Sequence, residues 1–121
     1  MSHRILIVDD EPNIVISLEY LMRKEGFQVA VATDGETALQ LASEFVPDLI
    51  LLDVMMPKKS GFEVCQALRA DPALVATKII MLTAKCRESE VTKGLALGAN
   101  TYITKPFSTK DLIVQIKSLL E

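Results

Sequence analysis

Polar residues of the types that bind metal ions and phosphoryl groups follow several short apolar runs of the chain. They are Asp9, Asp10, Asp53, Thr83 and Lys105. Two carboxylates about 4–5 Å apart repel each other by roughly 4 kcal/mol at an effective dielectric constant near 20. A cluster of such acids therefore binds a proton or a cation. Water-facing oxygen ligands suit Mg²⁺, and a nearby ammonium and hydroxyl would complete a site for a phosphoryl group.

The chemistry of this set is phosphoryl transfer to a carboxylate, which gives an acyl phosphate. Taken singly, each residue has an ordinary explanation. Asp10 could cap a helix whose first turn contains Pro12. Asp53 could be a turn residue at a strand end, Thr83 could be an ordinary strand residue, and Lys105 could be a solvated charge. Because these residues occur together at the ends of four apolar runs, a site for phosphoryl transfer is favoured over these separate explanations. Glu11, the third consecutive acid, is expected on the solvated rim of that site rather than among its ligands.

The apolar runs themselves predict the strands that position these residues. They lie at residues 5–8, 27–32, 49–52, 79–82 and 101–104. Most are solidly apolar rather than alternating, which is typical of strands buried on both faces of a parallel sheet. Between the runs, apolar residues recur with helical spacing over residues 14–22, 38–45, 64–68, 91–95 and 112–120.

Boundary signals agree with these helices. Pro12 suits a first helical turn, Ser60 and Glu63 have the spacing of a capping box, and Gly98 and Ser108 suit the end of one helix and the start of the next. Strand and helix thus alternate five times. This alternation predicts an α/β, doubly wound, five-stranded parallel sheet in the order 2-1-3-4-5, with its ligand site at the carboxyl ends of the strands.

Length and composition restrict the class of protein. The chain has 121 residues, half of them apolar, and a net charge of −3, so we expect one globular domain over residues 1–121. This charge gives no general attraction to nucleic acid or to an anionic membrane. No apolar run is long enough to span a bilayer. The two cysteines, Cys65 and Cys86, form no disulfide framework, and we expect a cytoplasmic protein.

The motifs together resemble one known family. Asp9-Asp10, Asp53 followed by Met56-Pro57 and Gly61, Thr83-Ala84, Gly98-Ala99-Asn100, Tyr102 and Lys105-Pro106-Phe107 resemble the receiver domain of bacterial two-component response regulators. The resemblance extends from Arg4 to Leu120 and is greatest to chemotaxis-type, stand-alone receivers and to receivers at the head of larger regulators. It implies a flavodoxin-like fold. Asn100 stands where an acid is common in the family.

The resemblance implies a role for each site residue. Asp53 would accept a phosphoryl group from a phosphohistidine, and Asp10, Asp53 and the backbone carbonyl of Met55 would bind Mg²⁺, with Mn²⁺ as a second candidate. Asp9 would act through a metal-bound water. Thr83 and Lys105 would bind phosphoryl oxygens.

Further implications concern the switch and the partners. Thr83 and Tyr102 would move together as the switch, and the Lys105–Pro106 peptide bond would be cis. The partners would be a sensor histidine kinase or phosphotransfer protein, and a downstream protein or attached output domain. The surface formed by the last two helices and the strand between them would change on phosphorylation, and homodimerisation is one use open to it. The chain would catalyse only its own phosphorylation and dephosphorylation.

Three other functions compete with this one. A flavodoxin-like carrier shares the strand order, but the acids from Asp9 to Glu11 would repel a flavin phosphate, and the chain has no tryptophan to stack on a flavin. A haloacid-dehalogenase-type hydrolase needs an Asp nucleophile at the end of the first strand and a second Asp two residues later, where this chain has Pro12. It also has a cap domain, which we do not expect here. A degenerate receiver that only binds partners would not need so complete a set of site residues.

Overall fold

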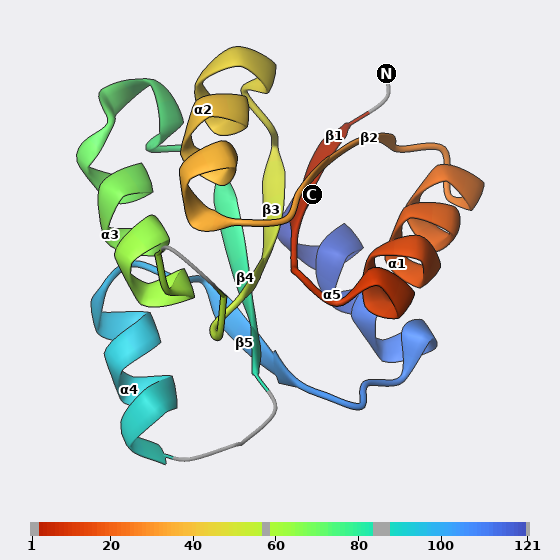
Figure 1. Cartoon of the computed structure of the whole chain (residues 1–121). Helices are drawn as coiled ribbons and strands as arrows, with labels where there is room; N and C mark the ends of the chain where they lie inside the picture. Colours follow the sequence, from red (N-terminus) through yellow and green to blue (C-terminus); the bar gives the residue numbers. More distant parts are fainter. Residues whose placement is uncertain (1–2, 57–58, 84–87, 121) are drawn as a thin grey trace.

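Strands and helices alternate along the chain as the apolar pattern predicts (Figure 1). The computed structural model describes residues 3–56, 59–83 and 88–120. The strands are β1 (Arg4–Val8), β2 (Gln28–Ala32), β3 (Leu49–Asp53), β4 (Lys78–Thr83) and β5 (Thr101–Thr104). The helices are α1 (Pro12–Lys24), α2 (Gly35–Phe45), α3 (Gly61–Ala70), α4 (Glu88–Ala96) and α5 (Thr109–Leu120), with a short 3₁₀ helix, η1, at Pro72–Leu74.

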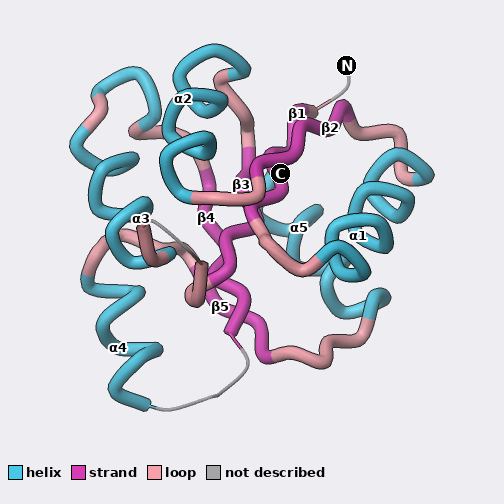
Figure 2. Tube along the Cα trace, viewed as in Figure 1, coloured by secondary structure: helices cyan, strands magenta, loops and turns pink. Residues whose placement is uncertain are grey.

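The five strands form one parallel sheet in the order β2-β1-β3-β4-β5, which confirms the predicted topology (Figure 2). Val8 pairs with Ala32 on one side and Leu52 on the other, and Thr83 pairs with Thr104. Because all strands run the same way, their carboxyl ends lie along one edge of the sheet. The strand order reverses next to β1, so the edge beyond β1 and β3 is the expected position of a site.

Both faces of the sheet are covered by helices, with α2, α3 and α4 on one face and α1 and α5 on the other (Figure 1). Successive strand residues point to opposite faces. Leu6 and Val8 therefore pack with the α2 and α3 residues of one apolar cluster, while Ile5 and Ile7 pack with the α1 and α5 residues of another. This double coverage explains why the strands are solidly apolar.

Local sequence signals begin most of the helices. The Asp34 side chain caps α2 by accepting from the backbone N–H of Thr37 at 2.8 Å. Ser60 and Glu63 form the predicted capping box at α3. The alternative that Asp10 caps α1 is wrong, because Glu11 occupies the cap position and makes no side-chain cap hydrogen bond. The chain passes Asp10 before the helix begins, which leaves that carboxylate exposed at the edge of the sheet.

Arg69 joins the end of α3 to the turn that follows α4. Its guanidinium donates to the backbone oxygens of Gly98 at 2.8 Å and Leu74 at 3.3 Å, and to the side-chain oxygen of Asn100 at 3.0 Å. The same Asn100 oxygen accepts from the backbone N–H of Ile79 at 2.8 Å. Four segments of the chain, α3, η1, β4 and the α4–β5 turn, are thus held together by one arginine and one amide.

Candidate functional site

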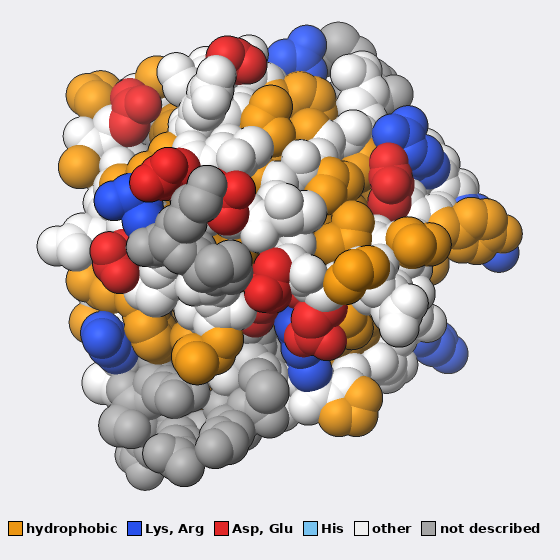
Figure 3. All heavy atoms as spheres, viewed as in Figure 1, with side chains coloured by type: hydrophobic (Ala, Val, Ile, Leu, Met, Phe, Trp, Pro, Cys, Tyr) orange, Lys and Arg blue, Asp and Glu red, His pale blue; other side chains and the backbone are white. Residues whose placement is uncertain are grey.

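The predicted site residues come together at the carboxyl edge of the sheet. Asp9 directly follows β1, Asp53 ends β3, Thr83 ends β4, and Lys105 directly follows β5. In the space-filling view, acidic side chains gather near the middle of the displayed face with a basic side chain beside them (Figure 3). Four strands therefore contribute polar groups to one place, although the residues span most of the sequence.

The acids form a compact cluster. One carboxylate oxygen each of Asp9, Asp10 and Asp53 lies within 4.8 Å of the others. Asp9 and Asp53 are buried, whereas Asp10 is exposed. The backbone holds the two buried carboxylates in place, because Asp9 accepts from the N–H of Glu11 at 3.0 Å and Asp53 accepts from the N–H of Met55 at 3.4 Å.

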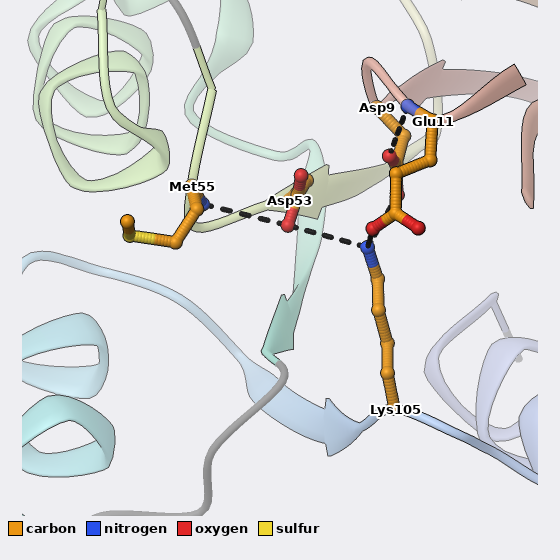
Figure 4. A network of polar contacts seen from close by, with 5 residues as sticks. All are labelled: Asp9, Glu11, Asp53, Met55 and Lys105. Carbon is orange, nitrogen blue, oxygen red and sulfur yellow. Dashed lines mark hydrogen bonds and ion pairs between the residues drawn. The ribbon is translucent and has the colours of Figure 1, made fainter.

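Lys105 extends from the end of β5 into this cluster (Figure 4). Its ammonium lies 2.8 Å from Asp9 Oδ2, 3.1 Å from Glu11 Oε1 and 3.4 Å from Asp53 Oδ1. The Lys105 side chain is 10% exposed. The ammonium offsets part of the negative charge, and it lies beside the carboxylate predicted to be the nucleophile.

Burial and, to a smaller extent, the negative charge of Asp9 raise the pKa of Asp53 from 3.8 to about 6. Lys105 and the Met55 N–H oppose this rise without cancelling it. For Lys105, burial lowers the pKa, but hydrogen bonds to Asp9 and Glu11 outweigh burial and hold the pKa above its ordinary value. Asp53 is therefore a carboxylate that a second cation would favour in its charged form.

The donor set fits a divalent hard cation. Three carboxylates converge, one of them faces water, and the lysine leaves the cluster with net negative charge. Mg²⁺ is bound in proteins by one or two carboxylates together with several waters. The arrangement of Asp9, Asp10 and Asp53 is typical of such a Mg²⁺ site.

The glycine that begins α3 lies very close to the backbone at the end of β3. The N–H of Gly61 donates to the backbone oxygen of Val54 at 2.8 Å. A Cβ at Gly61 would collide with the backbone oxygen of Asp53. This close approach gives a physical reason for the Gly61 that the motif contains.

Thr83 and Tyr102 lie beside a small apolar pocket. Thr83 is buried and Tyr102 is half-buried, and both line the pocket together with Phe62, Met81 and Gly94. Tyr102 pairs with Met81 in the sheet, two residues before the end of β4. The two residues predicted to move together therefore border a shared space.

Some sequence expectations need comment. The peptide bond between Lys105 and Pro106 is cis. Glu11 was expected on the solvated rim, and it is exposed, but its carboxylate also binds Lys105, which residue type and spacing did not predict. Cys65 is buried as a core residue. Pro57, Ala84 and Cys86 lie outside the described residues.

Comparisons with known proteins agree with this geometry. Residues 5–117 match the response regulator receiver domain family. The chain is 47% identical over 120 residues to the alkaline phosphatase synthesis transcriptional regulatory protein PhoP of Bacillus subtilis, covering 99% of this chain but 49% of that protein. The chain thus spans about half the length of this curated relative.

Solved structures give the same result. The chemotaxis response regulator CheY4 of Vibrio cholerae superposes with a TM-score of 0.94 at 32% identity, over 99% of this chain and 100% of that one. The receiver domain of the sensor histidine kinase PA1611 of Pseudomonas aeruginosa superposes with a TM-score of 0.91 at 28% identity, over 99% and 98% of the two chains. That structure has a magnesium ion coordinated in its active-site cleft.

The chain belongs to the response regulator receiver domain family. It is a phosphorylation-controlled signalling switch of the two-component type, with the flavodoxin-like fold of CheY. Receiver domains are phosphorylated by histidine kinases and regulate output domains. None of the helices within the described ranges has both the length and the apolar character needed to cross a membrane.

Proposed function

We propose that Asp53 is the residue that accepts the phosphoryl group. The observation that carries this proposal is the position of its carboxylate, which lies within reach of both the Asp9–Asp10 pair and the Lys105 ammonium. An oxygen of Asp53 attacks the phosphorus of a phosphohistidine on a sensor histidine kinase or phosphotransfer protein. The new O–P bond forms as the P–N bond breaks, and the imidazole leaves and takes up a proton.

The residues around Asp53 have distinct parts in this transfer. Asp10, Asp53 and the backbone carbonyl of Met55 would hold Mg²⁺ or Mn²⁺, and Asp9 would act on the metal through a water. The metal supplies neutralisation of the carboxylate and phosphoryl charge. Lys105 donates to one phosphoryl oxygen and the Thr83 hydroxyl to another, which positions the group and stabilises its developing charge.

The phosphorylated state changes the surface of α4, β5 and α5. Thr83 moves toward the phosphoryl group and Tyr102 turns into the pocket that both residues line. The phosphate thereby shifts an existing equilibrium between two conformations. The altered surface controls a downstream protein or an attached output domain, or forms a homodimer. Residues 1–121 act as one cytoplasmic receiver domain, which binds no nucleic acid or membrane itself and catalyses no reaction other than its own phosphorylation and dephosphorylation.

The test is phosphorylation by a small acyl phosphate with Mg²⁺, followed by intact mass measurement. The wild-type chain should gain one phosphoryl group, and chelation of the metal should prevent the gain. Asp53→Asn should gain none, while Asp48→Asn, which removes an exposed carboxylate elsewhere, should react as the wild type does. Phosphorylation of Asp53→Asn at the wild-type rate would disprove the assignment.

A further inference from the structure

The Lys105 ammonium is engaged by carboxylates other than the proposed nucleophile. It donates hydrogen bonds to Asp9 at 2.8 Å and to Glu11 at 3.1 Å, whereas its distance to the Asp53 oxygen is 3.4 Å (Figure 4). An ammonium has three donors and no acceptor. Asp9, Glu11 and Asp53 all lie within 3.4 Å of the ammonium, so three carboxylates already face its three donors. A phosphoryl group on Asp53 therefore has to compete for one of these donors.

The two hydrogen-bonded partners differ in how easily they release Lys105. The Asp9 side chain is fully buried, so loss of the lysine would leave a buried charge unpaired, which is costly. The Glu11 side chain is 60% exposed, so water can replace the lysine at little cost. Glu11 is therefore the partner that Lys105 can leave when a phosphoryl oxygen arrives.

We propose that Glu11 is a positioning residue that restrains Lys105 in the unphosphorylated state and thereby slows phosphorylation and weakens retention of the phosphoryl group. This inference rests on the proposed function and assigns to Glu11 a role in setting the balance between the two states. Glu11 acts through Lys105: its carboxylate holds the ammonium toward the first loop, away from the place where the phosphoryl oxygens would lie.

Glu11 can be replaced without removing another visible contact of this loop. It occupies the cap position of α1, yet its side chain makes no cap hydrogen bond. Its other hydrogen bonds are made by its backbone: the N–H donates to Asp9 at 3.0 Å, and the oxygen accepts from the N–H of Val15 at 3.0 Å. A change of side chain preserves both backbone bonds, so a change in phosphorylation rate would report on the carboxylate itself.

The experiment measures the rate of phosphorylation by a small acyl phosphate, and the dissociation constant for trifluoroberyllate with Mg²⁺, in Glu11→Gln and Glu11→Asp. An exposed charge pair at close range corresponds to about a fivefold change in an equilibrium or rate. Glu11→Gln should phosphorylate about fivefold faster and bind trifluoroberyllate more tightly. Glu11→Asp keeps the charge but shortens the reach to Lys105, so it should be faster than the wild type as well.

Two controls identify the route of the effect. Glu19→Gln removes the same charge from α1, the helix that Glu11 precedes. The Glu19 carboxylate binds Arg23 instead, so this variant should leave both measurements unchanged. In a Lys105→Met background, Glu11→Gln should have no further effect, because a double-mutant cycle isolates the pair. Circular dichroism checks that each variant is folded.

The outcomes separate this inference from the function on which it rests. A folded wild-type chain that gains no phosphoryl group overturns both. A wild-type chain that is phosphorylated, with Glu11 variants at the wild-type rate, overturns only the role of Glu11. Two further outcomes would also overturn the role of Glu11. One is acceleration in Glu11→Gln but not in Glu11→Asp, and the other is acceleration that persists in the Lys105→Met background. Either would mean that negative charge near the site acts without Lys105.

Discussion

Asp53 combines burial with a neighbouring like charge, and this combination ties proton binding at the site to the stability of the fold. Its carboxyl has a pKa of about 6 in the folded chain, above its ordinary value of 3.8. The folded chain therefore holds this proton more tightly than the unfolded chain does. In buffer without divalent metal, the free energy of unfolding should fall as the pH rises from about 4 through 6.

Asp53→Asn should remove this pH dependence, because an amide carries no charge at any of these pH values. The variant should be more stable than the wild type at pH 8 in a chelating buffer, by an amount on the order of 1–3 kcal/mol, and the difference should shrink toward pH 4. Urea unfolding at several pH values measures this. Glu44→Gln, at an exposed position on α2, controls for the change in net charge. An equal difference at pH 4 and pH 8 would exclude proton binding as its origin.

At the scale of secondary-structure elements, the strands were predictable almost to the residue. Residues 101–104 match β5, and the other predicted runs end within one residue of β1 to β4. This accuracy has a physical reason: strands buried on both faces must be apolar throughout, so their ends coincide with the first polar residue. Asp9, Asp53 and Thr83 are the first polar residues after such apolar runs, and this is why the sequence alone indicated the carboxyl edge.

Other contacts left no signal in the residue types. Arg69 binds backbone oxygens of Gly98 and Leu74, and every residue has such an oxygen, so no pattern marks the partner. The contact of Glu11 with Lys105 depends on the path of the short loop after β1 and on two flexible side chains. The 3₁₀ helix at Pro72–Leu74 was also missed, since Asp71-Pro72 indicated only that α3 ends there.

Gly94 offers a direct test of packing in α4. A Cβ at this position would meet Met81 Cγ and Phe62 Cε1, each at 3.6 Å, which is an ordinary contact distance. Alanine is favoured over glycine within a helix by about 1 kcal/mol. Gly94→Ala should therefore raise the free energy of urea unfolding by about 1 kcal/mol.

The matched control is the glycine that follows the same helix. Gly98 has a φ of +111°, and a Cβ there would lie 2.5 Å from Arg69 Cγ. Gly98→Ala should destabilise the fold, so the two substitutions should have opposite signs. A destabilising Gly94→Ala would show that α4 packs more closely against α3 and β4 than these distances indicate.

Arg69→Met should destabilise the chain by roughly 2–3 kcal/mol, because it removes the guanidinium donor of the Gly98 oxygen and one of the two donors to Asn100 Oδ1. Amide hydrogen exchange should also become faster in residues 97–101. Arg23→Met is the comparison, since Arg23 is exposed and pairs with Glu19 on the same helix, where a loss of less than about 1 kcal/mol is expected. Equal losses in the two variants would contradict the anchoring role of Arg69.

At the scale of the whole molecule, the sheet separates two apolar layers, and the acidic site lies at one edge between them. Charge concentrated at that edge acts against folding until a cation is bound. A ligand that binds only the folded chain stabilises the whole domain, by about 1.4 kcal/mol at ten times its dissociation constant. The site and the global stability are therefore coupled.

Mg²⁺ should raise the thermal midpoint of the wild-type chain by about 5 °C at ten times its dissociation constant, and a chelator should reverse the change. Asp10→Asn should behave differently in two ways. Its midpoint without metal should be higher than that of the wild type, because one of three crowded carboxylates is gone, and Mg²⁺ should barely change it. Calorimetry measures both, and a Mg²⁺-dependent rise of the same size in Asp10→Asn would remove that residue from the metal site.

The distribution of aromatic residues also gives the molecule an optical property. The chain has two tyrosines and no tryptophan. Tyr20 is 69% exposed on α1, so Phe can replace it with little effect on packing. In Tyr20→Phe, all tyrosine emission comes from Tyr102, the residue that lines the pocket beside Thr83. The intrinsic ultraviolet fluorescence of such a chain would follow the surroundings of that one ring, without an attached dye.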